Sequence, residues 1–295
     1  MNRLDEQYQS LLFRVLTGGL SKDDRTGTGT RSVFGEQIKH DMSEGFPILT
    51  TKRVAFKTMV TELKWFLKGD TNIKYLVENN CNIWNGDAFN NYKSNGGKID
   101  NQADFIDKIK GMPQESHFVA KHGELGPIYG AGWRSWKTQG GTIDQIAELV
   151  KGLKEDPDSR RHIVSAWDVG RLDQMYLPPC HMMFQCYVAD GKLSLMWNQR
   201  SVDAPLGLPF NLSSYGLLLL LLCRETGYQP GELIANLGDT HIYNNQIEGA
   251  KEQLDRKPYE LPEVVLNNVD LLAGEFNVEL VGYEHHPAIK MPLSN

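Results

Sequence analysis

The chain has 295 residues, of which 40% are hydrophobic and 23% are charged, and its formal net charge is −6 at pH 7. A chain of this length and composition can bury a substantial core, which excludes a disordered polymer and a coiled coil, so we expect one domain over residues 1–295. The acidic balance argues against a surface that coats nucleic acid. Any anionic ligand must therefore be held by a local basic pocket.

Neither the cysteines nor the N-terminal pattern indicates secretion. The four cysteines lack CxxC spacing, and MNRLDEQYQSLLFRVL is an amphipathic pattern with acidic residues, unlike a signal peptide. The most apolar run, GLLLLLLC over 216–223, is much shorter than the roughly 20 residues of a membrane span and predicts a buried core helix. We expect a reduced, cytoplasmic protein with no membrane partner.

The first predicted helix covers residues 58–69, where apolar residues recur at helical spacing and a glycine stands at the C-cap position. Residues 90–123 follow as a polar stretch that contains glycine and lysine. We interpret this stretch as a surface insertion that does not divide the domain.

The second half of the chain alternates helical and strand patterns. Helical spacing over 143–157 stops at a proline, and residues 161–168 are typical of a strand. Residues 182–197 predict a hairpin that turns at Asp190-Gly191, a strong two-residue turn signal. These patterns predict an α/β (α+β) fold in which helices and a sheet share one core.

The stretch LPPCHMMFQ places Cys180 directly behind two prolines. Prolines fix the chain and lack a backbone donor, so Cys180 should stand at the beginning of a strand. A free cysteine is commonly only a small buried hydrophobe, but a fixed thiol can also be a nucleophile. A cysteine hydrolase with His181 as base is one alternative, although strand neighbours point to opposite faces and His181 is badly placed for it.

Arginines next to small polar residues provide candidate anion sites. DPDSRRH carries Arg160 and Arg161, NQRSVD carries Arg200 and Ser201, and DDRTGTGT carries Arg25 in a loop of glycine and threonine. Guanidinium groups near a hydroxyl suit a phosphate, and they also stabilise a thiolate. Each arginine alone could equally be a solvated surface residue.

Eight motifs together identify a family: DDRTGTGT, GFPILTTKR, ELKWFLKGDTN, GELGPIYG, DPDSRRHIVSAW, LPPCHMMFQCYVADGKLSLMWNQRSVD, LGLPFNLSSY and GDTHIYNNQ. In this order they closely resemble thymidylate synthases of the folate-dependent, dUMP-methylating type, a family related to the pyrimidine-nucleotide hydroxymethylases. The resemblance extends from about residue 23 to residue 292.

This resemblance implies a homodimer in which a large twisted mixed β-sheet from each subunit packs against its partner. It also implies reductive methylation of dUMP to dTMP by 5,10-methylenetetrahydrofolate, which leaves as dihydrofolate, with no metal. Cys180 would be the thiolate that adds to uracil C6 and makes C5 nucleophilic. Arg200 would activate it, because a nearby guanidinium lowers the pKa of a thiol.

The resemblance further implies a role for each residue at the nucleotide. Asn211 would read the uracil O4 and N3–H edge, because one carboxamide both donates and accepts. Arg25, Arg200 and Ser201 would hold the phosphate together with an arginine pair from the partner subunit, and a histidine and a tyrosine would hold the deoxyribose. The dUMP residues implied are Arg25, Arg160, Arg161, Cys180, His181, Gln199, Arg200, Ser201, Asp203, Asn211, His241 and Tyr243, of which Arg160 and Arg161 would act across the dimer interface.

Proton transfer and folate binding are assigned in the same way. Glu62 would relay protons through water, and Tyr129 would assist removal of the C5 proton. The alternative for Glu62 is an ordinary solvent-facing position, which is usual for a glutamate on an amphipathic helix. The catalytic set implied is Cys180, Glu62, Tyr129, Arg200, Asp203 and Asn211. The folate set implied is Ile83, Trp84, Asp203, Leu206, Gly207, Phe210 and Ser294.

Some positions depart from the commoner family pattern. Asp87 stands where many members carry a second tryptophan, Asn198 where a tyrosine is usual, and Ala55 at a folate-side position that is often histidine. The chain also ends in LSN, whereas most members end in a small residue followed by valine or isoleucine. Two alternatives therefore stand beside thymidylate synthase: a dUMP hydroxymethylase, and a non-catalytic nucleotide- or RNA-binding regulator, although nucleic acid is not required by the resemblance.

Overall fold

A β-hairpin supplies two adjacent strands of the main sheet. In the computed structural model, which describes residues 2–294, β6 (His181–Ala189) pairs antiparallel with β7 (Lys192–Asp203). Asp190 and Gly191 have φ values of 49° and 72°, the left-handed conformations of a two-residue type I′ turn. The predicted hairpin and its turn are confirmed, and both strands extend beyond the predicted residues.

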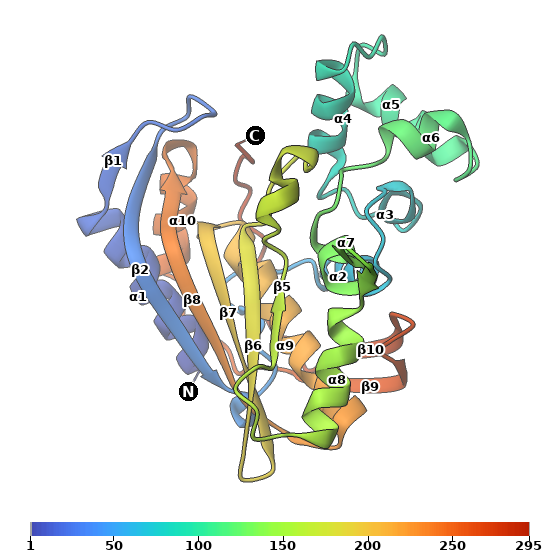
Figure 1. Cartoon of the computed structure of the whole chain (residues 1–295). Helices are drawn as coiled ribbons and strands as arrows, with labels where there is room; N and C mark the ends of the chain where they lie inside the picture. The colour runs from blue at the N-terminus through green and yellow to red at the C-terminus, as the bar shows by residue number, and fades with distance from the viewer. Residues whose placement is uncertain (1, 295) are drawn as a thin grey trace.

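The main sheet has six strands in the order β1-β2-β8-β7-β6-β5 (Figure 1). It is mixed because β7 runs parallel to β8 (Gln229–Tyr243), and a parallel pair needs a crossover, which is α9 (Gly207–Thr226). The other strands are β1 Leu20–Lys22, β2 Thr30–Asp41, β5 Ile163–Ser165, and two separate hairpins, β3 Trp136–Thr138 with β4 Gly141–Ile143 and β9 Glu263–Asp270 with β10 Glu275–Val281.

Helix α9 contains the predicted core segment at 216–223. Among the described residues it is the one helix whose length and composition would allow a membrane span, but 67% of its apolar window is buried within the fold, as expected of a core helix. The other helices are α1 Arg3–Gly18, α2 Phe56–Leu67, α3 Lys74–Glu78, α4 Asn85–Ser94, α5 Gln102–Gly111, α6 His117–His122, α7 Tyr129–Arg134, α8 Gln145–Glu155 and α10 Ile247–Leu254, with 3-10 turns η1 Met42–Glu44, η2 Val169–Gln174 and η3 Asn244–Gln246.

The register of the sheet separates a covered face from an open face. Ile38, Ala235, Trp197 and Phe184 stand side by side on neighbouring strands and are all buried. The Trp197 ring stacks on Tyr215 of α9 with centroids 4.8 Å apart. This face of the sheet therefore carries the core.

The open face begins one residue away in each strand, because side chains alternate along a strand. It carries Gln37, Asn236, Asn198 and Met183 in register, and these residues are exposed or half-buried. Gln37 donates to Asn236 (2.7 Å), and Asn236 donates to Asn198 (3.2 Å). Asn198, which stands where the resembled family usually has a tyrosine, therefore lies on the open face.

The helices predicted at 58–69 and 143–157 are confirmed as α2 and α8, whereas the strand predicted over 161–168 is limited to β5. Its C-terminal part turns away because the Asp168 side chain accepts from Gly170 N (3.2 Å) and caps η2.

The stretch at 90–123 projects beside the sheet and is largely helical, carrying the end of α4 together with α5 and α6 (Figure 1). It has an apolar centre of its own, where the Tyr92 and Phe105 rings stack with centroids 4.9 Å apart and Val119 is fully buried. The polar composition thus concealed helices that pack on one another.

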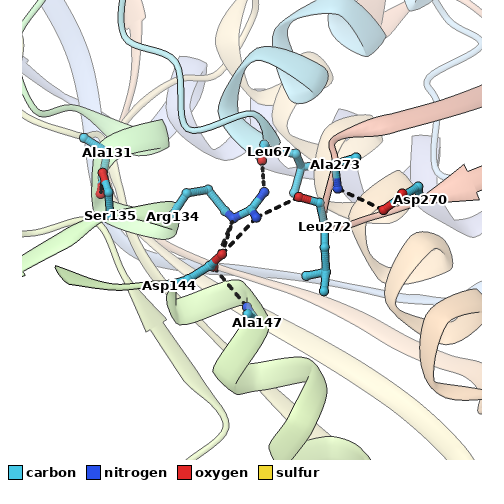
Figure 2. Close-up of polar contacts among 9 residues, drawn as sticks. All are labelled: Leu67, Ala131, Arg134, Ser135, Asp144, Ala147, Asp270, Leu272 and Ala273. Atoms are coloured by element: carbon cyan, nitrogen blue, oxygen red, sulfur yellow. Dashed lines mark hydrogen bonds and ion pairs between the residues drawn. The ribbon is translucent and has the colours of Figure 1, made fainter.

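Arg134 joins four elements at one point (Figure 2). Its guanidinium binds the Asp144 carboxylate at 2.8 to 3.0 Å and donates to Leu272 O (2.7 Å) and Leu67 O. Asp144 also caps α8 by accepting from Ala147 N (3.0 Å). The end of α2, the end of α7, the start of α8 and the β9–β10 turn are therefore fixed together.

Candidate active site

Cys180 immediately precedes β6, as predicted, and its backbone is held on both sides. Its N–H donates to the Tyr129 hydroxyl (2.8 Å), and its carbonyl accepts from Arg200 N (2.8 Å). The Arg200 side chain donates to the carbonyls of Pro179 (3.0 Å) and Pro178 (2.7 Å). The two prolines and Arg200 therefore fix the thiol at the end of the hairpin.

Burial and charge act in opposite directions on the Cys180 thiol. Burial raises its pKa, the charges of Arg200 and Arg25 oppose this, and the Asp87 carboxylate adds to it, so the pKa lies above its ordinary value. Arg200 thus lowers the pKa of the Cys180 thiol, as predicted. In the isolated chain, however, desolvation outweighs it, and the thiol is favoured over the thiolate.

Glu62 on α2 does not have the solvent-facing position that is ordinary for a glutamate on an amphipathic helix. The residue is half-buried, and its carboxylate accepts from Trp84 Nε1 (2.8 Å). Burial raises the pKa of Glu62 to about 7, although the hydrogen bond from Trp84 lowers it. A carboxyl with such a pKa both takes up and releases a proton near neutral pH.

His181 faces the core. Its ring stacks on Tyr129 with centroids 4.1 Å apart, and Nδ1 lies 2.8 Å from the Tyr215 hydroxyl. Burial lowers the pKa of His181 to about 3. These contacts argue against His181 as the base of a cysteine hydrolase, and its direct contact with a nucleotide stays a prediction.

Asn211 is held by a chain of buried amides and rings. Trp197 Nε1 donates to Gln199 Oε1 (3.1 Å), and Gln199 Nε2 donates to Asn211 Oδ1 (3.1 Å) and to Ser201 O (3.1 Å). Gln199 is only 4% exposed, so it supports Asn211 from behind. The Asn211 Nδ2 group is left to donate, and Oδ1 keeps a second lone pair.

The start of α9 carries three of the predicted folate residues, Leu206, Gly207 and Phe210, next to Asp203 at the end of β7. A Cβ at Gly207 would lie 3.7 Å from the Asp203 Cβ and 3.9 Å from Asn211 Oδ1. Asp203 accepts from Leu206 N (2.9 Å) through Oδ1. Phe210 is half-buried one turn along the helix. Ile83 and the buried Trp84 stand at the N-terminus of α4, where the Trp84 ring lies with its centroid 6.2 Å from that of Tyr129.

Sequence reasoning missed two buried groups beside Asp203. Lys52 donates to Pro205 O, and burial lowers the pKa of its amine to about 8 against the raising effect of Asp203. Gln246 donates to Asp203 Oδ2 (3.1 Å). Lys52 lies in the motif GFPILTTKR and Gln246 in the motif GDTHIYNNQ. The motifs therefore marked both positions, but the sequence did not indicate what either side chain does.

The loop of Arg25 and the end of β8 meet at the edge of the site. Asp24 accepts from Thr26 N (2.9 Å) and Gly29 N (2.7 Å), which fixes the loop, and Arg25 is exposed. His241 Nδ1 lies 3.2 Å from Asp239 Oδ1. Tyr243 follows two residues later in β8 and is half-buried.

The chain does not bring Arg160 and Arg161 to its own Cys180. Both are exposed, and Arg160 O accepts from Gln185 Nε2 (3.4 Å). Gln185 is five residues beyond Cys180 in β6, a separation of about 16 Å along a strand. These two arginines therefore stand apart from the other predicted residues.

Comparison with known proteins identifies the family. The family model described as "Thymidylate synthase" matches residues 6–295. The chain belongs to the thymidylate synthase family. Thymidylate synthase of Mycoplasma mobile is 50% identical over 97% of this chain and 98% of its own length. Those of Listeria monocytogenes serotype 4b (strain CLIP80459) and Listeria innocua serovar 6a are 50% identical over 98% of this chain and 99% of theirs.

The thymidylate synthase family uses dUMP and methylenetetrahydrofolate. Among residues 2–294 no group of three or more histidine, cysteine, aspartate or glutamate side chains is placed to hold a metal ion. Asp87, which stands where many family members carry a second tryptophan, lies within the site. Burial raises the pKa of its carboxyl, and Arg25 opposes that shift.

Proposed function

We propose that the protein is a thymidylate synthase that converts dUMP and 5,10-methylenetetrahydrofolate to dTMP and dihydrofolate. The observation that carries this proposal is the fixed Cys180 thiol, held by Tyr129 and Arg200 at the end of the hairpin. The identity of 50% to thymidylate synthases over nearly the whole chain supports the same reaction.

In the proposed reaction the Cys180 sulfur forms a bond to uracil C6, and the electron pair moves to C5 and O4. Asn211 donates to the developing charge on O4 through its free Nδ2 group. The C5 carbon then forms a bond to the methylene carbon of the folate, and the bond from that carbon to N10 breaks, so that the folate stays attached through N5 alone. Loss of the C5 proton, expulsion of tetrahydrofolate, hydride transfer from it to the exocyclic methylene and departure of Cys180 complete the turnover.

In this proposal Glu62 and Tyr129 move the protons. The pKa of Glu62, raised by burial to about 7, suits a group that exchanges protons with ordered water. The Tyr129 hydroxyl accepts from Cys180 N, which places it beside the thiol. Trp84 would stack against the pterin and keep water from the reacting methylene.

We further propose that the enzyme is a cytoplasmic homodimer that joins through the open face of the sheet. This face includes Tyr187 (66% exposed), four residues after Met183 in β6, a large apolar side chain that a partner would cover. Arg160 and Arg161 are exposed and directly precede the edge strand β5. Across a dimer they would complete the phosphate site with Arg25, Arg200 and Ser201.

Mass spectrometry with 5-fluoro-dUMP and methylenetetrahydrofolate tests the nucleophile. We expect a covalent adduct on Cys180, and the Cys180→Ser variant should bind dUMP without turnover. An adduct on Cys81, Cys186 or Cys223 would refute the assignment. With dUMP itself, dTMP and stoichiometric dihydrofolate are expected, whereas 5-hydroxymethyl-dUMP with unoxidised tetrahydrofolate would indicate a hydroxymethylase.

Subunit mixing tests the interface. A Cys180→Ser subunit mixed with an Arg160→Ala/Arg161→Ala subunit should regain activity, because one hybrid site then has a native cysteine and a native arginine pair. Failure to recover activity after verified subunit exchange would place both arginines outside the partner's site.

A further inference from the structure

Gln246 lies where three parts of the proposed site meet. It is the last residue of η3 and is fully buried. Its amide oxygen accepts from Tyr243 N (3.2 Å), and its amide nitrogen donates to Asp203 Oδ2 (3.1 Å) and to Pro292 O (3.2 Å). One side chain therefore contacts the end of β8, the end of β7 and the C-terminal tail.

The orientation of this amide is determined by its partners. The nitrogen faces a carboxylate and a carbonyl, which only accept, and the oxygen faces an N–H, which only donates, so the opposite orientation would lose all three hydrogen bonds. The other oxygen of Asp203 accepts from Leu206 N (2.9 Å). Gln246 thus completes the set of bonds that fixes the Asp203 carboxylate.

The residues next to Gln246 hold the rest of the tail. Asn245 donates to the Ser294 hydroxyl (3.2 Å), and Thr28 of the Arg25 loop donates to the same oxygen (3.4 Å). Met291 packs so closely over Gly249 that a Cβ there would lie 2.7 Å from its methyl carbon. The tail is therefore docked on η3 and α10.

Resting on the proposed function, we propose that Gln246 is a positioning residue for the folate end of the site. Its single buried amide both orients the Asp203 carboxylate and docks the C-terminal tail. The two features are therefore coupled, because loss of either partner frees the amide that holds the other.

The first test uses no substrate, so it is independent of the proposed reaction. Gln246→Met keeps the side-chain volume and removes both donated hydrogen bonds. Carboxypeptidase should then release Ser294 and Leu293 about tenfold faster than in the wild type, as expected for the loss of the buried hydrogen bond to Pro292 O. Release is followed by mass spectrometry of the intact chain.

Gln145 provides a matched control. It also donates two hydrogen bonds, to Gly132 O (2.6 Å) and Ser165 O (2.7 Å), and accepts one, from Ser165 N (3.0 Å). Gln145→Met should lower stability without changing tail release. Equal tail release in Gln246→Met and Gln145→Met would overturn the proposal.

The second test separates positioning from folding. Gln246→Glu keeps the acceptor for Tyr243 N but places a second carboxylate beside Asp203, and a like charge raises the pKa of such a pair. The groups that face Asp203 are Lys52, whose charge opposes this shift, and Tyr8 and Tyr243, whose pKa values are raised by burial so that both remain neutral. As the pH falls, uptake of one proton removes the repulsion between the two carboxylates and restores one donated hydrogen bond, so part of the tail protection should return.

Steady-state kinetics complete the test. Gln246→Met should raise KM for methylenetetrahydrofolate about tenfold with a smaller effect on KM for dUMP, and Gln145→Met should change neither. Tail release in Gln246→Glu that does not depend on pH, or an unchanged folate KM in Gln246→Met, would refute the coupling. A wild-type enzyme that makes no dTMP would refute the proposed function and leave the tail-release result standing.

Discussion

Replacement of Glu62 by glutamine should stabilise the protein at alkaline pH while abolishing turnover. In the folded chain burial raises the pKa of Glu62 from 4.5 to about 7. A difference of this size corresponds to about 3 kcal/mol between the two protonation states. Glutamine has no charge to bury and keeps an oxygen that accepts from Trp84 Nε1, so Glu62→Gln removes the cost without removing the hydrogen bond.

The sign follows from proton binding. Between pH 4.5 and 7 the folded state of the wild type holds the Glu62 proton more tightly than the unfolded state does. The contribution of Glu62 to the free energy of unfolding is therefore full below pH 4.5 and is lost as the pH rises through 7. The advantage of Glu62→Gln over the wild type should be near its minimum at pH 4.5, grow with pH, and level off above pH 7 at about 3 kcal/mol.

Urea unfolding of both proteins at several pH values, at one fixed protein concentration, measures this difference. Turnover of dUMP measured on the same samples should be lost in Glu62→Gln at every pH. A stability difference that does not change between pH 5 and pH 8 would refute the idea that Glu62 is held in its neutral form by burial.

Three further outcomes are expected. Trp84→Phe keeps an aromatic ring but removes the donor to Glu62, so the Glu62 pKa in the pH profile of kcat/KM should rise by about one pH unit; an unchanged profile would contradict the contact. Arg134→Leu should lower the free energy of unfolding by about 3 kcal/mol because it leaves the Asp144 carboxylate unpaired. Arg134→Lys should restore only part of this stability, since lysine lacks the planar fork of the guanidinium group. Full restoration by lysine in urea unfolding would argue against a role for the forked contact with Asp144. Asn211→Asp should shift preference from dUMP toward dCMP, since a carboxylate accepts from the cytosine amino group; competition between the nucleotides measures this, and unchanged discrimination would exclude the role.

The elements that could be predicted from sequence are those whose signals are local. Asp190 and Gly191 set the hairpin turn by their own backbone preferences, and the helices at 58–69 and 143–157 follow from apolar spacing and their end signals. The packed helices at 90–123 were missed because their apolar residues are sparse and face one another, a contact that spacing within one helix does not reveal.

The site shows the same division. The thiol of Cys180 at the beginning of a strand follows from the two prolines, and the family motifs supply the other candidates. The pKa of Glu62 could not be predicted, because it depends on burial by residues distant in sequence and on a hydrogen bond from Trp84. Gln246 was missed because its three partners come from the ends of two strands and from the tail.

The charges around Cys180 explain why the proposed site would need arginines from a second subunit. Within one chain, Arg200 and Arg25 only partly offset the burial and the Asp87 carboxylate that raise the thiol pKa. A nucleotide phosphate brings a charge of roughly −2 at neutral pH, which cancels the positive charge of these two arginines and removes their support for the thiolate. A site complete within one chain would therefore lose thiolate when substrate binds. Two additional arginines from a partner restore a positive surplus, and this is the contribution that the proposal assigns to Arg160 and Arg161.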